Sequence, residues 1–84
     1  MYKFIYSKQS IKDSKNITKL GLGSKIYELL IIIRNNPFQN PPPYEKLKGS
    51  SNRYSRKINK QHRLVYEIYE ENIIKIDRMW SHYE

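Results

Sequence analysis

The spacing of apolar residues changes along the chain from a period of two, through a helical spacing, back to a period of two. Residues 2–6, YKFIY, alternate and are rich in aromatic and β-branched side chains, which predicts a first β-strand. Ser7 is a favourable N-cap for a polar helix over residues 8–20, which ends at the sequence GLG. Ser24 is the expected N-cap of a second helix, which Pro37 ends.

The second helix and the C-terminal half predict how the elements pack. One stripe of the helix is apolar and needs a sheet to cover it: Ile26, Leu29, Leu30 and Ile33. Residues 37–53 are dense in proline, asparagine, serine and glycine and predict a long irregular loop. Three strand-like runs follow, separated by breaks of three residues: 54–58, 62–69 and 73–80. The order β-α-α-β-β-β predicts one α+β domain over residues 1–84, with a two-helix hairpin on one face of an antiparallel sheet.

Turns of three residues also predict the register of the two hairpins. In that register Lys57 faces Arg63, and Glu67 faces Lys75. The other expected pairs are Ile58 with His62, Ser55 with Val65, Tyr69 with Ile73, and Arg63 with Met79. One sheet face then collects the apolar residues Ile58, Leu64, Tyr66, Ile68, Ile74 and Ile76. The opposite face is polar.

Two cations lie side by side on this polar face. Because like charges opposite each other destabilise a sheet, the pair of Lys57 and Arg63 suits a place where an anion lies between them. The last strand runs back toward Arg63, so we expect His82 and Tyr83 to emerge beside the cation pair.

The amino-acid composition indicates which classes of partner and cofactor to expect. A net charge of +8 favours a polyanionic partner such as nucleic acid, although charge also serves to solvate a small domain. With no cysteine and two histidines, the chain offers no ligand set for a metal, and we expect no metal or cofactor. No apolar run is long enough to span a membrane, and no signal peptide is recognisable, so we expect a soluble cytoplasmic protein with no membrane partner.

Several residues have a structural interpretation beside a functional one. His62 falls on the apolar face and suits a structural hydrogen bond near the turn, and Arg56 could extend from the edge of that face. Tyr44, Tyr54 and Trp80 could stack on nucleobases, although aromatic residues beside strands more often pack.

Three blocks, YEKLKG, YSRKINKQHRLVYEI and the terminal HYE, together resemble the Txe/YoeB family of bacterial toxins in the RelE/ParE superfamily. The resemblance spans the full chain and implies a RelE-like microbial RNase fold. It also implies an endoribonuclease that cuts messenger RNA in the ribosomal A site, with a cognate acidic antitoxin as its inhibitor. By position in the family's motifs, the catalytic residues would be Glu45, Arg63, His82 and Tyr83, and the RNA or phosphate contacts Lys48, Arg56 and Lys57.

The implied chemistry uses the 2′-hydroxyl of RNA as the nucleophile. Glu45 would take its proton, Arg63 would stabilise charge on the phosphate, and His82 or Tyr83 would protonate the leaving oxygen. Two other functions stay open: a non-catalytic ParE-like toxin that inhibits a protein such as DNA gyrase, and a small basic RNA-binding protein. A homodimer also stays open.

Overall fold

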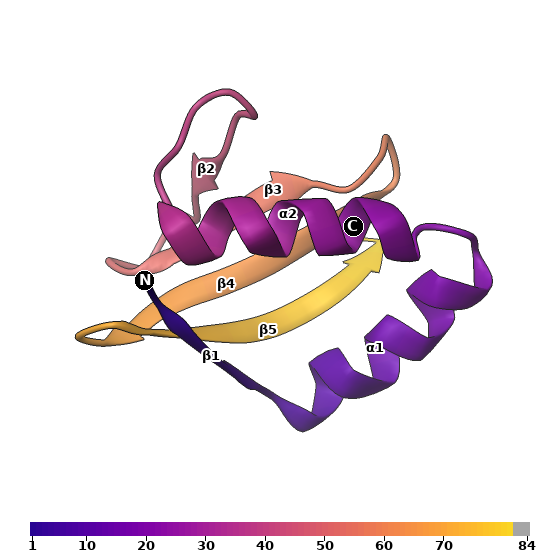
Figure 1. The fold of residues 1–84 in the computed structure, drawn as a ribbon, viewed down its shortest axis with the longest axis horizontal. Helices are drawn as coiled ribbons and strands as arrows, with labels where there is room; N and C mark the ends of the chain where they lie inside the picture. Colours follow the sequence, from indigo (N-terminus) through magenta and orange to yellow (C-terminus); the bar gives the residue numbers. More distant parts are fainter. Residues whose placement is uncertain (82–84) are drawn as a thin grey trace.

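Five strands form one sheet in the order β1-β5-β4-β3-β2, and two helices pack against it (Figure 1). The computed structural model describes residues 1–81. The elements are β1 Lys3–Tyr6, α1 Lys8–Lys19, α2 Gly23–Asn35, β2 Glu45–Lys46, β3 Arg53–Lys57, β4 His62–Glu70 and β5 Ile73–Ser81. The predicted α+β class is confirmed. No helix within residues 1–81 is long and apolar enough to cross a membrane.

The two ends of the sheet differ from the prediction. β1 pairs with β5 in parallel, with Lys3 opposite Ile73, so the expectation of an entirely antiparallel sheet is wrong at this strand. A parallel neighbour needs a long crossover, which the chain between β1 and β5 provides. The other strand pairs are antiparallel as predicted. At the opposite edge, the alternation did not predict the two-residue strand β2.

Of the two predicted helix N-caps, only the first is confirmed. The hydroxyl oxygen of Ser7 accepts the amide of Ser10 at 2.9 Å and caps α1 as predicted. α2 begins at Gly23 with Leu22 as its N-cap, and no side chain within residues 1–81 caps it by a hydrogen bond. The predicted N-cap at Ser24 is therefore wrong.

Apolar residues from both helices, from β4 and β5, and from the residue directly after β3 form one core. Its buried members are Ile17, Ile26, Leu29, Ile33, Ile58, Leu64, Tyr66, Ile74, Ile76 and Met79. The predicted apolar sheet face is confirmed, with Ile68 half-buried at its margin. The helices therefore leave the opposite sheet face open for the polar residues.

A bulge in β5 changes the face on which its last residues lie. Val65 pairs with Arg78, whereas the next residue of β4, Tyr66, pairs with Ile76, so Asp77 is an extra residue in β5. An uninterrupted strand would direct Arg78 toward the helices together with Ile76. The bulge instead places Arg78 on the open face.

The residues after the bulge follow the shifted register. Met79 pairs with Leu64 and is buried, while Trp80 pairs with Arg63. The predicted pair of Arg63 and Met79 is therefore wrong. The predicted pair of Tyr69 and Ile73 is also wrong, because a second irregularity near the turn sets Ile73 opposite Glu70. The pairs Lys57 with Arg63 and Glu67 with Lys75 are confirmed.

Arg56 is buried on the helix face, where it holds the long loop. It pairs with Leu64 and is 0% exposed. Its guanidinium donates to the hydroxyl of Tyr66 at 3.2 Å and to three backbone carbonyls, those of Pro37 at 3.0 Å, Gln39 at 2.9 Å and Pro42 at 2.6 Å. A buried guanidinium with these partners does not face a ligand, so the prediction that Arg56 contacts phosphate is contradicted. Arg56 fixes the path of the loop that leads into β2.

Replacing Arg56 with methionine keeps an unbranched side chain but removes the guanidinium that donates to the loop. The carbonyls of Gln39 and Pro42 would lose the guanidinium donor, and the Tyr66 hydroxyl would keep only its bond to the Pro37 carbonyl, so we expect the free energy of unfolding to fall by roughly 3 kcal/mol or more. Urea denaturation followed by circular dichroism measures this loss. Lys57→Met, on the exposed neighbouring residue, is the control and should stay within about 0.5 kcal/mol of wild type. Equal stability of the two variants would contradict the role given to Arg56.

Candidate active site

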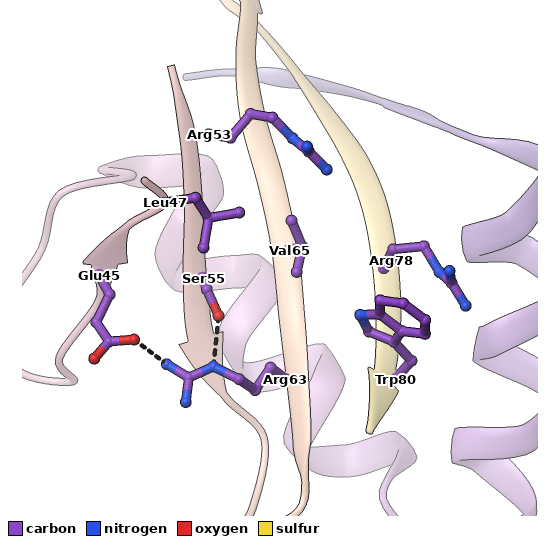
Figure 2. A pocket seen from close by; sticks show the side chains of 8 residues that line it. All are labelled: Glu45, Leu47, Arg53, Ser55, Arg63, Val65, Arg78 and Trp80. Carbon is purple, nitrogen blue, oxygen red and sulfur yellow. Dashed lines mark hydrogen bonds and ion pairs between the residues drawn. The ribbon is translucent and has the colours of Figure 1, made fainter. Parts of the chain in front are cut away.

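The open face of the sheet carries a groove of about 420 Å³ (Figure 2). Residues of β2, β3, β4 and β5 contribute to this groove. It is lined by Glu45, Leu47, Arg53, Ser55, Arg63, Val65, Arg78 and Trp80. Three of these are arginines, which present planar forks of N–H donors suited to phosphate groups. The groove therefore suits an anionic ligand, in agreement with the net charge of +8.

At one end of this groove, a carboxylate and a guanidinium meet. β2 brings Glu45 opposite Ser55 of β3, and β4 brings Arg63 onto the same face (Figure 2). Nη2 of Arg63 donates to Oε1 of Glu45 at 2.6 Å, and Nε donates to the buried hydroxyl oxygen of Ser55 at 2.7 Å. The Arg63 side chain is 22% exposed and the Glu45 side chain is 70% exposed. The Ser55 hydroxyl thus orients the guanidinium of Arg63, while the carboxylate of Glu45 stays accessible to an incoming group.

Lys57 completes the cationic end of the site. It is exposed on β3 directly opposite Arg63, as the register predicted. A second pocket of about 190 Å³ adjoins this point, lined by Pro43, Tyr44, Glu45, Lys57 and Arg63. Glu45 and Arg63 belong to both pockets. The carboxylate of Glu45 is thus the anion that lies beside this cation pair within the protein itself.

The structure separates Lys48 and Arg56 from this pair. Lys48 is exposed in the turn after β2 and lines neither pocket in the described part of the chain. The amide of Leu47 donates to the carbonyl of Arg53, so this turn lies at the opposite end of β3 from Lys57. Arg56 is buried, as described above. The predictions for His82 and Tyr83 fall outside the described residues.

Arg53 and Arg78 line the groove but were missed by the sequence reasoning. Nε of Arg53 lies 3.2 Å from Oδ2 of Asp77, and Nε of Arg78 lies 2.8 Å from Oδ2 of Asp13. An unbroken period of two through β5 would place Arg78 on the apolar face, whereas the bulge at Asp77 reverses the faces after it. The two consecutive charged residues Asp77 and Arg78, which break the alternation of β5, were the available signal.

The pKa values of two carboxyl groups near the groove, those of Asp13 and Glu67, shift in opposite directions. Burial raises the pKa of Asp13, but hydrogen bonds from Arg78, from the amide of Met79 and from Gln9 outweigh it, so this pKa lies below its ordinary value. Burial raises the pKa of Glu67, and the neighbouring carboxyl group of Asp77 raises it further. Within residues 1–81, no three histidine, aspartate or glutamate side chains gather as a metal site would require.

The aromatic residues divide between packing and the groove. Tyr44 and Tyr54 pack edge to face with ring centroids 5.9 Å apart, and Phe38 packs against both. These contacts support the packing interpretation for the two tyrosines. Trp80 instead lines the groove. Nδ1 of His62 lies 3.1 Å from Oδ1 of Asn59 in the turn, which confirms the predicted structural hydrogen bond.

Comparison with known proteins agrees with the resemblance. The family model described as "YoeB-like toxin of bacterial type II toxin-antitoxin system" matches residues 6–83. Among solved structures, a YoeB/ParE toxin from Agrobacterium tumefaciens is 25% identical, with a TM-score of 0.85 and coverage of 96% of this chain and 99% of that one. The YoeB dimer from Staphylococcus aureus is 36% identical, with a TM-score of 0.83 and 98% of each chain covered.

A more distant structure shares the fold alone. The DinJ-YafQ complex from E. coli contains a chain that is 20% identical, with a TM-score of 0.83 and coverage of 98% of this chain and 94% of that one. The comparison with curated protein sequences finds no match to this chain.

The ion pair of Asp13 and Arg78 makes a prediction about acid stability. Because the pKa of folded Asp13 is below the unfolded value of about 3.9, its stabilisation is complete above that pH and is lost as the pH falls through the folded pKa. Asp13→Asn should therefore lower the free energy of unfolding by about 1–3 kcal/mol at pH 7, and by less below about pH 4.

Urea denaturation across this pH range measures the difference between the variant and wild type. Glu28→Gln on the exposed face of α2 controls for the loss of one carboxylate. A deficit in Asp13→Asn that stays constant down to pH 3 would contradict the assigned ion pair.

Proposed function

The chain belongs to the family of YoeB-like toxins of bacterial type II toxin–antitoxin systems, and we propose that it is an endoribonuclease that cuts messenger RNA in the ribosomal A site. The observation that carries this proposal is the 2.6 Å contact between the Glu45 carboxylate and the Arg63 guanidinium at the junction of two open pockets. A proton acceptor beside a phosphate-binding cation is what cleavage by an internal 2′-hydroxyl requires.

The reaction transfers one phosphoryl group within the RNA. The 2′-oxygen bonds to phosphorus, the bond from phosphorus to the 5′-oxygen breaks, and the products are a 2′,3′-cyclic phosphate and a 5′-hydroxyl. Glu45 accepts the proton of the 2′-hydroxyl as that oxygen attacks. Arg63 stabilises the additional charge on the phosphate oxygens, with Lys57 as a second cation beside it. Ser55 keeps the guanidinium of Arg63 oriented.

The leaving 5′-oxygen needs a proton, which we assign to the terminal pair. His82 and Tyr83 follow β5 directly in the sequence, one residue after Ser81. As an imidazolium, His82 donates its proton to the leaving oxygen, and Tyr83 orients it or takes its place. Lys48 contributes to binding of the RNA strand beyond the two pockets.

The proposed partners follow from the charge and from the relatives. Solved relatives include a YoeB-YefM complex from Staphylococcus aureus and a DinJ-YafQ toxin-antitoxin complex from E. coli. We therefore assign this chain a cognate antitoxin, acidic enough to complement a net charge of +8. Its messenger substrate and the ribosome place its action in the cytoplasm, and the YoeB dimer of Staphylococcus aureus makes a homodimer one assembly to test.

Glu45→Gln removes the proton acceptor while keeping the size of the side chain. We expect cleavage to slow by about 10²- to 10⁴-fold, because this is the usual contribution of a general base. An in vitro translation reaction, followed by primer extension on the messenger, measures the rate. Glu28→Gln on α2 is the matched control and should cut like wild type.

Two outcomes would contradict this proposal in different ways. Undiminished cleavage by Glu45→Gln would remove Glu45 from the mechanism. An absence of cleavage by the wild type, with or without ribosomes, would favour inhibition of a protein target or simple RNA binding.

The terminal pair is tested by comparing His82→Ala with Tyr83→Phe in the same assay. If His82 delivers the proton, His82→Ala should lose about 10²-fold or more and Tyr83→Phe much less. The reverse order of losses would assign the proton to Tyr83.

A further inference from the structure

Trp80 is the single tryptophan of the chain, and it lines the groove directly opposite Arg63 in the pairing of β4 with β5. We propose that Trp80 is a stacking platform for the nucleobase next to the phosphate that Arg63 binds, with Arg78 and Asp13 as its positioning residues. This inference rests on the proposed function, because it takes RNA as the occupant of the groove.

The bulge in β5 is what brings the indole to this place. Without Asp77 as an extra residue, Trp80 would share the face of Ile74 and Ile76 and would join the core. Met79 occupies the core instead, and Trp80 is half-buried among the residues of the groove (Figure 2). A large aromatic ring beside Arg63 adds little to the core, and a base has a π-face that it can bind.

Contacts on the side of α1 hold the indole in position. The guanidinium carbon of Arg78 lies 3.4 Å from the centroid of the Trp80 ring system, in a stacked cation–π contact. Nε and Nη2 of the same guanidinium donate to the Asp13 carboxylate at 2.8 and 3.2 Å. The Asp13 carboxylate also accepts the amide of Met79 at 3.0 Å, so one acidic side chain fixes both the strand and the stacked arginine.

These contacts hold the indole of Trp80 in its binding orientation before RNA binds. A side chain held in its binding conformation loses less freedom on association, so more of the stacking energy appears as affinity. Because every base has a π-face, the platform should tolerate different bases at this position. Arg63 and Trp80 would thus divide the recognition of one nucleotide between its phosphate and its base.

The fluorescence of Trp80 reports on the proposed contact without interference from another tryptophan. The wild-type protein is titrated with a single-stranded 2′-O-methyl RNA of about ten nucleotides, which cannot be cut by attack of a 2′-hydroxyl. We expect this RNA to quench the emission, and an abasic oligonucleotide of the same length and charge to quench it far less. Equal quenching by the two oligonucleotides, or no quenching by either, would overturn the proposal.

Variants of Trp80 separate stacking from charge. The affinity of each variant for a dye-labelled copy of the same RNA is read from the anisotropy of the dye. Trp80→Ala should weaken binding about tenfold, and Trp80→Phe should recover most of the loss because it keeps an aromatic face. Equal affinities of wild type and Trp80→Ala would also overturn the proposal. Because no step needs cleavage, these results stand apart from the test of Glu45.

The positioning role of Arg78 has its own signature. In the time-resolved anisotropy of Trp80, Arg78→Ala should add a fast component, because the indole loses the guanidinium stacked on it. Arg34→Ala, on the exposed surface of α2, removes the same charge elsewhere and should leave the decay unchanged. A wild-type decay in Arg78→Ala would refute the positioning role.

Discussion

The hydrogen bonds of the buried Arg56 guanidinium are the constraint on which the site depends. One side chain from β3 takes up the carbonyls of Pro37, Gln39 and Pro42 and the hydroxyl of Tyr66. A charge that is 0% exposed is tolerated because its donors meet these acceptors. The loop between α2 and β2 is thereby tied to the sheet, and β2 carries Glu45 to the open face beside Arg63. Arg56, on the sheet face that the helices cover, therefore helps to determine where Glu45 lies on the open face.

On the open face, each arginine of the groove is held by a carboxylate. Arg63 contacts Glu45, Arg53 contacts Asp77, and Arg78 contacts Asp13. An exposed pair such as Arg63 with Glu45 adds little stability, but each pair fixes the direction of a long cationic side chain. The protein thereby keeps these three guanidinium groups oriented along the groove. Electrostatic groups that are already oriented need little rearrangement when the charge of a phosphate develops.

Much of the fold was readable from the sequence because its pairings are local. The two short turns of the C-terminal half set Lys57 opposite Arg63, and the alternation identified most of the buried sheet face. β1 was assigned correctly as a strand, but its parallel partner is far away in the chain, and local patterns carry no information about it. The bulge at Asp77 was missed because an unbroken period of two was assumed through β5, although Asp77 and Arg78 interrupt it.

The site residues divide in a similar way. Alternation alone indicated the cation pair, whereas Glu45 lies in a strand too short to show a pattern and came only from the family resemblance. Arg56 and Arg63 are both arginines in neighbouring strands, but the register places them on opposite faces of the sheet. Arg56 is buried and binds the loop, whereas Arg63 lines the groove.

We propose that the Glu45 and Arg63 pair activates the 2′-hydroxyl of a messenger on the ribosome. The most direct measurement replaces the nucleotide on the 5′ side of the cut with its 2′-deoxy form and follows cleavage of that messenger on programmed ribosomes. We expect this one bond to become resistant, while the all-ribose messenger is cut to a 2′,3′-cyclic phosphate. Cleavage at an unchanged rate next to the deoxynucleotide would contradict it.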